Sequence, residues 1–125
     1  VQEIARGSLE LVVGLKRDPV FGMVVMVGIG GIFVEVLRDV VFRKAPVSAP
    51  QAKDMLMDLQ GAAMLDGVRG APPVDMRALT ELIAAVSRFG ASASGQVTEL
   101  DLNPVLAGSD GAVVVDWLLI QDADQ

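Results

Sequence analysis

The longest apolar stretch of this 125-residue chain, residues 20–36, is divided by polar or small residues into pieces of strand length. The interruptions are Gly22, Gly28, Gly30, Gly31 and Glu35. A bilayer-spanning helix needs about 20 consecutive apolar residues, so this stretch is not expected to cross a membrane. Residues 23–27, bounded by glycines, and residues 32–37, which alternate partly, are instead predicted to be strands.

Two further strands are predicted around this stretch. Residues 9–16 (LELVVGLK) are rich in Val and Leu, which favours a strand. Residues 40–43 are expected to pair with 32–37 as a hairpin, with Arg38 and Asp39 at the turn.

The first of two predicted helices begins at Ser48. Ser48 is an N-cap candidate, Pro50 lies in the first turn, and Gln51 has capping-box spacing. One apolar face follows, formed by Ala52, Met55, Leu56 and Leu59. Gly61 is expected to end this helix.

The second helix follows a loop over residues 67–73 (GVRGAPP), where Gly and Pro oppose regular structure. Asp75 is its expected N-cap, and Gly90 is its expected C′ residue. Its apolar residues recur at i, i+3 and i+4 spacing and are Met76, Leu79, Leu82, Ile83, Val86 and Phe89. Residues 91–96 are expected to be a loop.

Two strands, 97–102 and 112–120, are predicted to close the chain, joined by turns at Asn103-Pro104 and at residues 109–111. Strands, then helices, then strands predict an α+β fold. We expect one domain over residues 1–125, a mostly antiparallel sheet with two helices packed on it.

Charge and residue usage exclude several functions. Asp and Glu outnumber Lys and Arg by 16 to 10, for a net charge of -6, which argues against a nucleic-acid surface. The chain has no histidine and no cysteine. A Ser-His triad, a thiol nucleophile and a phosphohistidine therefore cannot be formed by these residues. The lack of cysteine fits a cytoplasmic location.

The most distinctive pattern is ELDLNP at residues 99–104. In a strand, Glu99, Asp101 and Asn103 share one face, and Thr98, Leu100 and Leu102 share the other. A row of carboxylate and amide oxygens suits Mg²⁺, and Asp116 could approach Asn103 if the last two strands pair. The alternative is an edge strand whose polar face meets solvent.

Two other clusters are less specific. Residues 28–31 (GIGG) lack the full dinucleotide and P-loop patterns, so a phosphate cradle and a strand-to-strand turn both remain open. Lys16 and Arg17 are adjacent cations before Pro19. They could clamp a phosphate or could end a solvated strand.

Read in order, these elements resemble the ATP-grasp domain of NDP-forming acyl-CoA synthetases, relatives of succinyl-CoA synthetase. The stretches that carry the resemblance are residues 1–22 (VQEIARGSLELVVGLKRDPVFG), 26–46 (MVGIGGIFVEVLRDVVFRKAP), 65–75 (LDGVRGAPPVD), 99–106 (ELDLNPVL) and 113–116 (VVVD). The family's domain is about twice as long, so the chain resembles its C-terminal half, a fragment of a larger protein.

The resemblance implies a role in nucleotide binding for several residues. Gln2, Glu3 and Ala5 resemble the hinge strand whose backbone meets the adenine edge. Glu10 resembles the acidic residue that binds the ribose hydroxyls. Lys16 and Arg17 match a basic pair expected to face phosphate.

The resemblance also implies a metal site. Asn103 and Asp116 resemble its Mg²⁺ ligands, with Asp101 in the usual acidic position. Arg69 lies in the family's GVRG loop, whose role does not follow from the sequence. Trp117-Leu118 stands where the family usually has Ala-Arg, which removes a cation next to Asp116.

The implied function is the ATP/ADP- and Mg²⁺-binding portion of an ADP-forming acid–CoA ligase, inactive on its own. The expected partners are a nucleotide, a CoA-binding domain in the same or a partner chain and, through surface left bare by the missing half, a second copy. Two alternatives remain open: another ATP-grasp ligase that uses an acyl-phosphate, and a non-catalytic regulatory domain that kept the fold.

Overall fold

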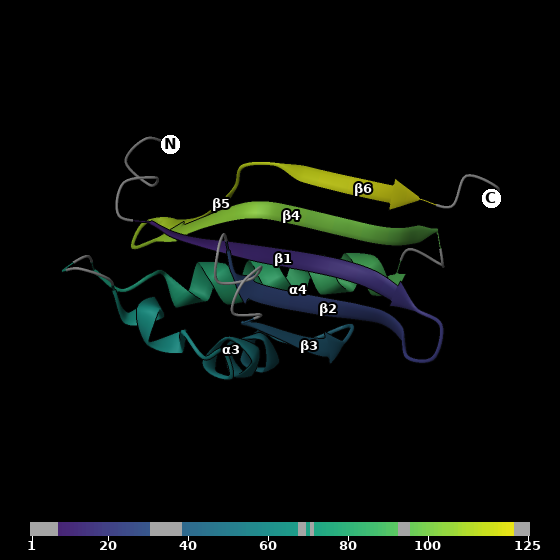
Figure 1. Ribbon diagram of the computed structural model, residues 1–125, viewed down its shortest axis with the longest axis horizontal. Coiled ribbons are helices and arrows are strands. Elements are labelled where there is room, and N and C mark those ends of the chain that lie inside the picture. Colours follow the sequence, from purple (N-terminus) through teal and green to yellow (C-terminus); the bar gives the residue numbers. More distant parts are fainter. Residues whose placement is uncertain (1–7, 31–38, 68–69, 71, 93–95, 122–125) are drawn as a thin grey trace.

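The computed structural model describes residues 8–30, 39–67, 70, 72–92 and 96–121, and it contains one six-stranded sheet (Figure 1). The strands are β1 (Leu9–Asp18), β2 (Gly22–Ile29), β3 (Val40–Lys44), β4 (Val97–Gly108), β5 (Gly111–Val114) and β6 (Trp117–Gln121). Their order is β3-β2-β1-β4-β5, and β6 also pairs with β4. All pairings among the described strands are antiparallel. The predicted α+β architecture is confirmed.

Two α-helices, α3 (Ala49–Met57) and α4 (Met76–Ser92), pack on one face of the sheet, and the short 3-10 helix η1 (Ala62–Asp66) lies between them in sequence. The alternation of β1 explains which face is covered. Leu11, Val13 and Leu15 are buried among the helices, whereas Glu10 and Lys16 are exposed on the other face. The second face is therefore the open face of the sheet. None of the described helices is long and apolar enough to cross a membrane.

Both predicted helix starts are confirmed by their caps. The Ser48 backbone N–H donates to Gln51 Oε1 at 2.8 Å, and the Gln51 N–H donates to Ser48 Oγ at 3.2 Å, which completes a capping box. The Ala78 N–H donates to Asp75 Oδ1 at 3.0 Å. In both cases a side-chain oxygen satisfies an amide that has no partner within the helix.

The predicted helix ends were wrong in two places. Helix α3 ends at Met57, before Gly61. Gly61 makes a tertiary contact instead: its N–H donates to Asp39 Oδ2 at 2.8 Å. Gly90 lies inside α4, which continues to Ser92. A Cβ on Gly90 would lie 2.7 Å from Leu15 Cδ1, so this glycine allows close helix–sheet packing.

The turn predicted at Asn103-Pro104 was also wrong, because β4 continues through both residues. The pairing of β1 with β4 shifts register between Leu11 and Val13, so that Asn103 and Pro104 together face Val12. Pro104 has no N–H to donate, and a bulge is one of the few places where a sheet tolerates proline.

The strand predicted over 112–120 is divided into β5 and β6. The break lies at Val115 and Asp116, beside the bulge of β4. There the Asn103 N–H donates to the Asp116 carbonyl at 3.2 Å, and the Val115 N–H donates to the Pro104 carbonyl at 3.0 Å. The turn at residues 109–111 is confirmed, with Gly111 at φ 135°.

The hairpin predicted between 32–37 and 40–43 is only partly described. Residues 32–37 and Arg38 lie outside the described residues. Strand β3 pairs with β2. Asp39, expected at the turn, is 4% exposed, and its Oδ1 accepts from the Gln60 N–H at 2.7 Å. Asp39 therefore ties the start of β3 to the segment after α3.

Candidate functional site

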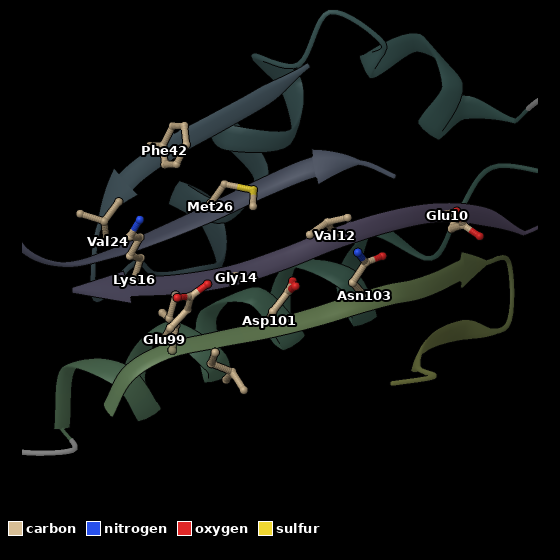
Figure 2. Close-up of a pocket in the computed structure, with 12 residues that line it drawn as sticks. Glu10, Val12, Gly14, Lys16, Val24, Met26, Phe42, Glu99, Asp101 and Asn103 are labelled. Carbon is tan, nitrogen blue, oxygen red and sulfur yellow. The ribbon is translucent and has the colours of Figure 1, made fainter. Parts of the chain in front are cut away.

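The open face of the sheet carries a pocket of about 450 Å³ (Figure 2). Strands β1 to β4 all contribute to it, and its lining residues are Glu10, Val12, Gly14, Leu15, Lys16, Val24, Met26, Phe42, Glu99, Leu100, Asp101 and Asn103. Alternation along β1 brings every second residue from Glu10 to Lys16 to this face. The pocket thus lies opposite the two helices.

The polar side of the pocket belongs to β4. Glu99, Asp101 and Asn103 all line it and project from one face (Figure 2), as their spacing predicts. Burial raises the pKa of the Asp101 carboxyl, and the negative charge of Glu99 raises it further. Of the residues predicted to share the other face of this strand, Leu100 and Leu102 are buried and Thr98 is exposed.

The two adjacent cations point to different faces. Lys16 lines the pocket and lies directly across from Glu99 on β4. Arg17 does not line this pocket, and its Nε donates to the Val97 carbonyl at 3.2 Å. Successive residues of a strand alternate faces, so only Lys16 of this pair is positioned to meet a ligand in the pocket.

The other side of the pocket is apolar. Val12, Val24, Met26 and Phe42 line it from β1, β2 and β3. The predicted ribose ligand Glu10 lies at one end of the same pocket, exposed, and its backbone carbonyl accepts from the Gly30 N–H at 2.7 Å. That bond continues the pairing of β1 with β2, and Gly28 and Ile29 belong to β2 and not to the turn that was one of the two interpretations of residues 28–31. Gly31 lies outside the described residues.

Sequence reasoning missed Gly14 and the apolar wall. Residues two apart in a strand share a face, so alternation along residues 9–16 would have placed Gly14 beside Glu10 and Val12. Met26 and Phe42 could not be found in the same way, because their position depends on the pairing of β2 with β1 and β3.

A backbone hydrogen bond places Asp116 next to Asn103. The Asp116 carbonyl accepts from the Asn103 N–H, while the Asp116 Oδ1 accepts from the Trp117 N–H at 2.8 Å. Asp116 is exposed and is not among the residues that line the pocket. In the described part of the chain, no three His, Cys, Asp or Glu residues are grouped so that they could hold a metal ion.

The remaining predicted site residues lie outside the described residues. These are Gln2, Glu3 and Ala5, expected near adenine, and Arg69 of the GVRG loop. Their roles, like those of the metal and phosphate residues, stay predictions.

The ATP-grasp domain model matches residues 1–120, a range that includes both α-helices and every strand that lines the pocket. The chain belongs to the ATP-grasp domain family. It is 42% identical over 120 residues to acetate–CoA ligase (ADP-forming) I of Archaeoglobus fulgidus, covering 96% of this chain and 17% of that protein. It is 41% identical over 111 residues to the beta subunit of acetate–CoA ligase (ADP-forming) I of Pyrococcus furiosus, covering 89% of this chain and 47% of that subunit.

A solved structure gives the same result. Dinucleotide-forming acetyl-coenzyme A synthetase 1 of Ca. Korarchaeum cryptofilum, in complex with coenzyme A and Mg-AMPPCP, has a TM-score of 0.85 and 43% sequence identity to this chain. The match covers 91% of this chain and 53% of that one. In that structure a phosphohistidine segment points towards the nucleotide binding site. The chain thus spans about half, or less, of the length of these relatives.

Proposed function

We propose that this chain is the nucleotide- and Mg²⁺-binding portion of an ADP-forming acyl-CoA synthetase. The observation that carries the proposal is the open-face pocket, which joins an apolar wall to a row of oxygen ligands and one lysine. A nucleotide has the same division, with an apolar base at one end and phosphates that need cations at the other. The relatives that match most of this chain are ADP-forming acid–CoA ligases.

In the proposed function, residues of the pocket and residues near the start of the chain would contact the nucleotide. Glu10, at one end of the pocket, would bind the ribose hydroxyls. Lys16 would neutralise phosphate oxygens, because it is the one cation among the described residues that line the pocket. Arg17, on the other face, would not touch the nucleotide, and its bond to the Val97 carbonyl would hold β1 against β4. The backbone from Gln2 to Ala5 would meet the adenine edge.

Asp101, Asn103 and Asp116 would hold Mg²⁺. Carboxylate and amide oxygens are the ligands this ion prefers. Burial, and the neighbouring Glu99 carboxylate, raise the pKa of Asp101 and disfavour its charged form. A cation bound between these side chains would stabilise that charged form. Asp116 is beside Asn103 in the backbone ladder, so a change of its side-chain rotamer would be needed to turn it to the site. A bound Mg²⁺ would neutralise charge that develops on the transferred phosphoryl group.

The rest of the reaction would belong to other parts of the parent protein. This chain has no histidine, so a phosphorylated histidine must come from elsewhere, as must the CoA-binding domain. The parent would convert acyl-CoA, ADP and phosphate to a free acid, CoA and ATP. The absence of cysteine fits a reducing, cytoplasmic compartment.

The test is nucleotide binding and turnover in the full-length protein. Glu10→Ala should weaken Mg·ATP binding about 10- to 150-fold in calorimetry, because one charge-assisted hydrogen bond contributes about 1.5–3 kcal/mol. Asp116→Ala should chiefly remove turnover. The matched control is Glu81→Ala, an exposed glutamate of α4 on the covered side of the sheet, which should leave both unchanged.

Unchanged Mg·ATP affinity in Glu10→Ala would refute the ribose assignment. A full-length protein that binds Mg·ATP and produces no ATP from acyl-CoA would favour the regulatory alternative. One observation supports that alternative: β6 sets the apolar Leu118 directly across from Asp101, where a cation would assist phosphate binding.

A further inference from the structure

Gly14 lies at the centre of the pocket floor. It belongs to β1, the third strand in the order of the sheet, and its neighbours across the ladder are Asp101 on β4 and Met26 on β2. Figure 2 shows Gly14 between Val12 and Lys16, with the Asp101 and Met26 side chains on either side. The missing side chain leaves the middle of the pocket open.

The backbone does not require glycine at this position. Among the described glycines, those with positive φ are Gly22, Gly67, Gly70 and Gly111, and Gly14 is not one of them. A Cβ on Gly14 would lie 3.3 Å from the Leu100 carbonyl oxygen and 3.5 Å from Met26 Cε. The first contact is tight and the second is ordinary, so a methyl group needs only a small shift.

A glycine inside a strand weakens the strand and often marks a place where a ligand approaches the backbone closely. The chemistry around Gly14 indicates which part of a ligand approaches. Asp101 lies directly across the ladder, and Lys16 is two residues further along the same face. Anionic phosphate is stable between a lysine and a carboxylate-bound metal ion and nowhere along the apolar wall.

We propose that Gly14 is a specificity-determining residue, over which the phosphate chain of the bound nucleotide passes between a metal ion at Asp101 and the ammonium group of Lys16. This inference rests on the proposed nucleotide-binding function. The effect of Gly14 is steric, because the absence of a side chain there sets how closely the phosphates approach the backbone of β1. A side chain there displaces the phosphates and leaves the ribose contact at Glu10 in place.

The experiment compares Gly14→Ala and Gly14→Val with wild type in the full-length protein, using calorimetric titration with Mg·ATP and with AMP. We expect Mg·ATP affinity to fall at least about tenfold in Gly14→Ala, which corresponds to about 1.4 kcal/mol, and further in Gly14→Val. AMP carries one phosphate, so its affinity should change less than about twofold. Thermal unfolding and far-UV circular dichroism report folding, and Gly14→Ala is decisive if the valine variant does not fold.

Glu81→Ala is the control, because Glu81 is an exposed residue of α4, on the covered side of the sheet and outside the pocket. Mg·ATP affinity should stay within about threefold of wild type in Glu81→Ala. Equal Mg·ATP affinity in wild type and a folded Gly14→Val would overturn the inference, as would an equal loss of AMP and Mg·ATP binding. Wild type that does not bind Mg·ATP would instead refute the proposed function itself.

Discussion

Gly90→Ala tests how closely α4 supports the strand that forms the pocket floor. A Cβ on Gly90 would lie 2.7 Å from Leu15 Cδ1 and 3.1 Å from Met23 Cγ. The shorter distance is about 0.8 Å below the usual carbon–carbon separation of about 3.5 Å. Leu15 is 2% exposed, so it has little room to move. Overpacking of this kind costs about 1–3 kcal/mol.

Helix propensity works in the opposite direction. Replacing glycine by alanine inside a helix contributes up to about 1 kcal/mol, and Gly90 lies in the last turn of α4, where the gain is smaller. We therefore expect a net loss of about 1 kcal/mol in the free energy of opening of α4. Hydrogen-exchange mass spectrometry on the α4 peptides of the full-length protein measures this loss.

A double-mutant cycle identifies the cause. Leu15→Ala leaves a cavity that the added methyl group of Gly90→Ala would partly fill, so the double variant should be more stable than the sum of the single effects predicts. Ala91→Gly, an exposed position in the same turn, reports the propensity term alone. Additivity within about 0.5 kcal/mol, or a stabilising Gly90→Ala, would refute the packing argument.

The parts of this fold that could be predicted from the sequence are those with local causes. The alternation of faces in β1 and the capping box at Ser48 each depend on neighbouring residues, and both appear in the structure (Figure 2). The shared face of Glu99, Asp101 and Asn103 is local in the same sense, because it follows from strand geometry alone.

The parts that could not be predicted depend on contacts between distant segments. Gly61 and Gly90 both stand where a glycine usually ends a helix. In the structure, the Gly61 N–H donates to Asp39, and Gly90 makes room for Leu15. Asn103-Pro104 is a typical turn sequence, and only the register shift against β1 keeps it inside β4. The apolar wall of the pocket likewise depends on which strands pair.

Two remaining predictions concern the open face. Asp101→Asn should raise the unfolding temperature of the ligand-free protein above that of wild type at pH 7. This difference between variant and wild type should disappear as the pH falls below the usual pKa range of a carboxyl group. Burial and a neighbouring carboxylate raise the pKa of Asp101, so its charged form destabilises the folded state and its protonated form does not. The 125-residue chain on its own should self-associate through the open face, because Phe42 and Leu118, each 58% exposed, and Ile120, 42% exposed, flank the pocket there. Sedimentation velocity over a range of concentrations should show association that Leu118→Lys reduces and that Val20→Lys, in the exposed β1–β2 turn, does not. A chain that remains monomeric at high concentration would show that this face is stable in water, and the apolar flanks would then need no second surface to cover them.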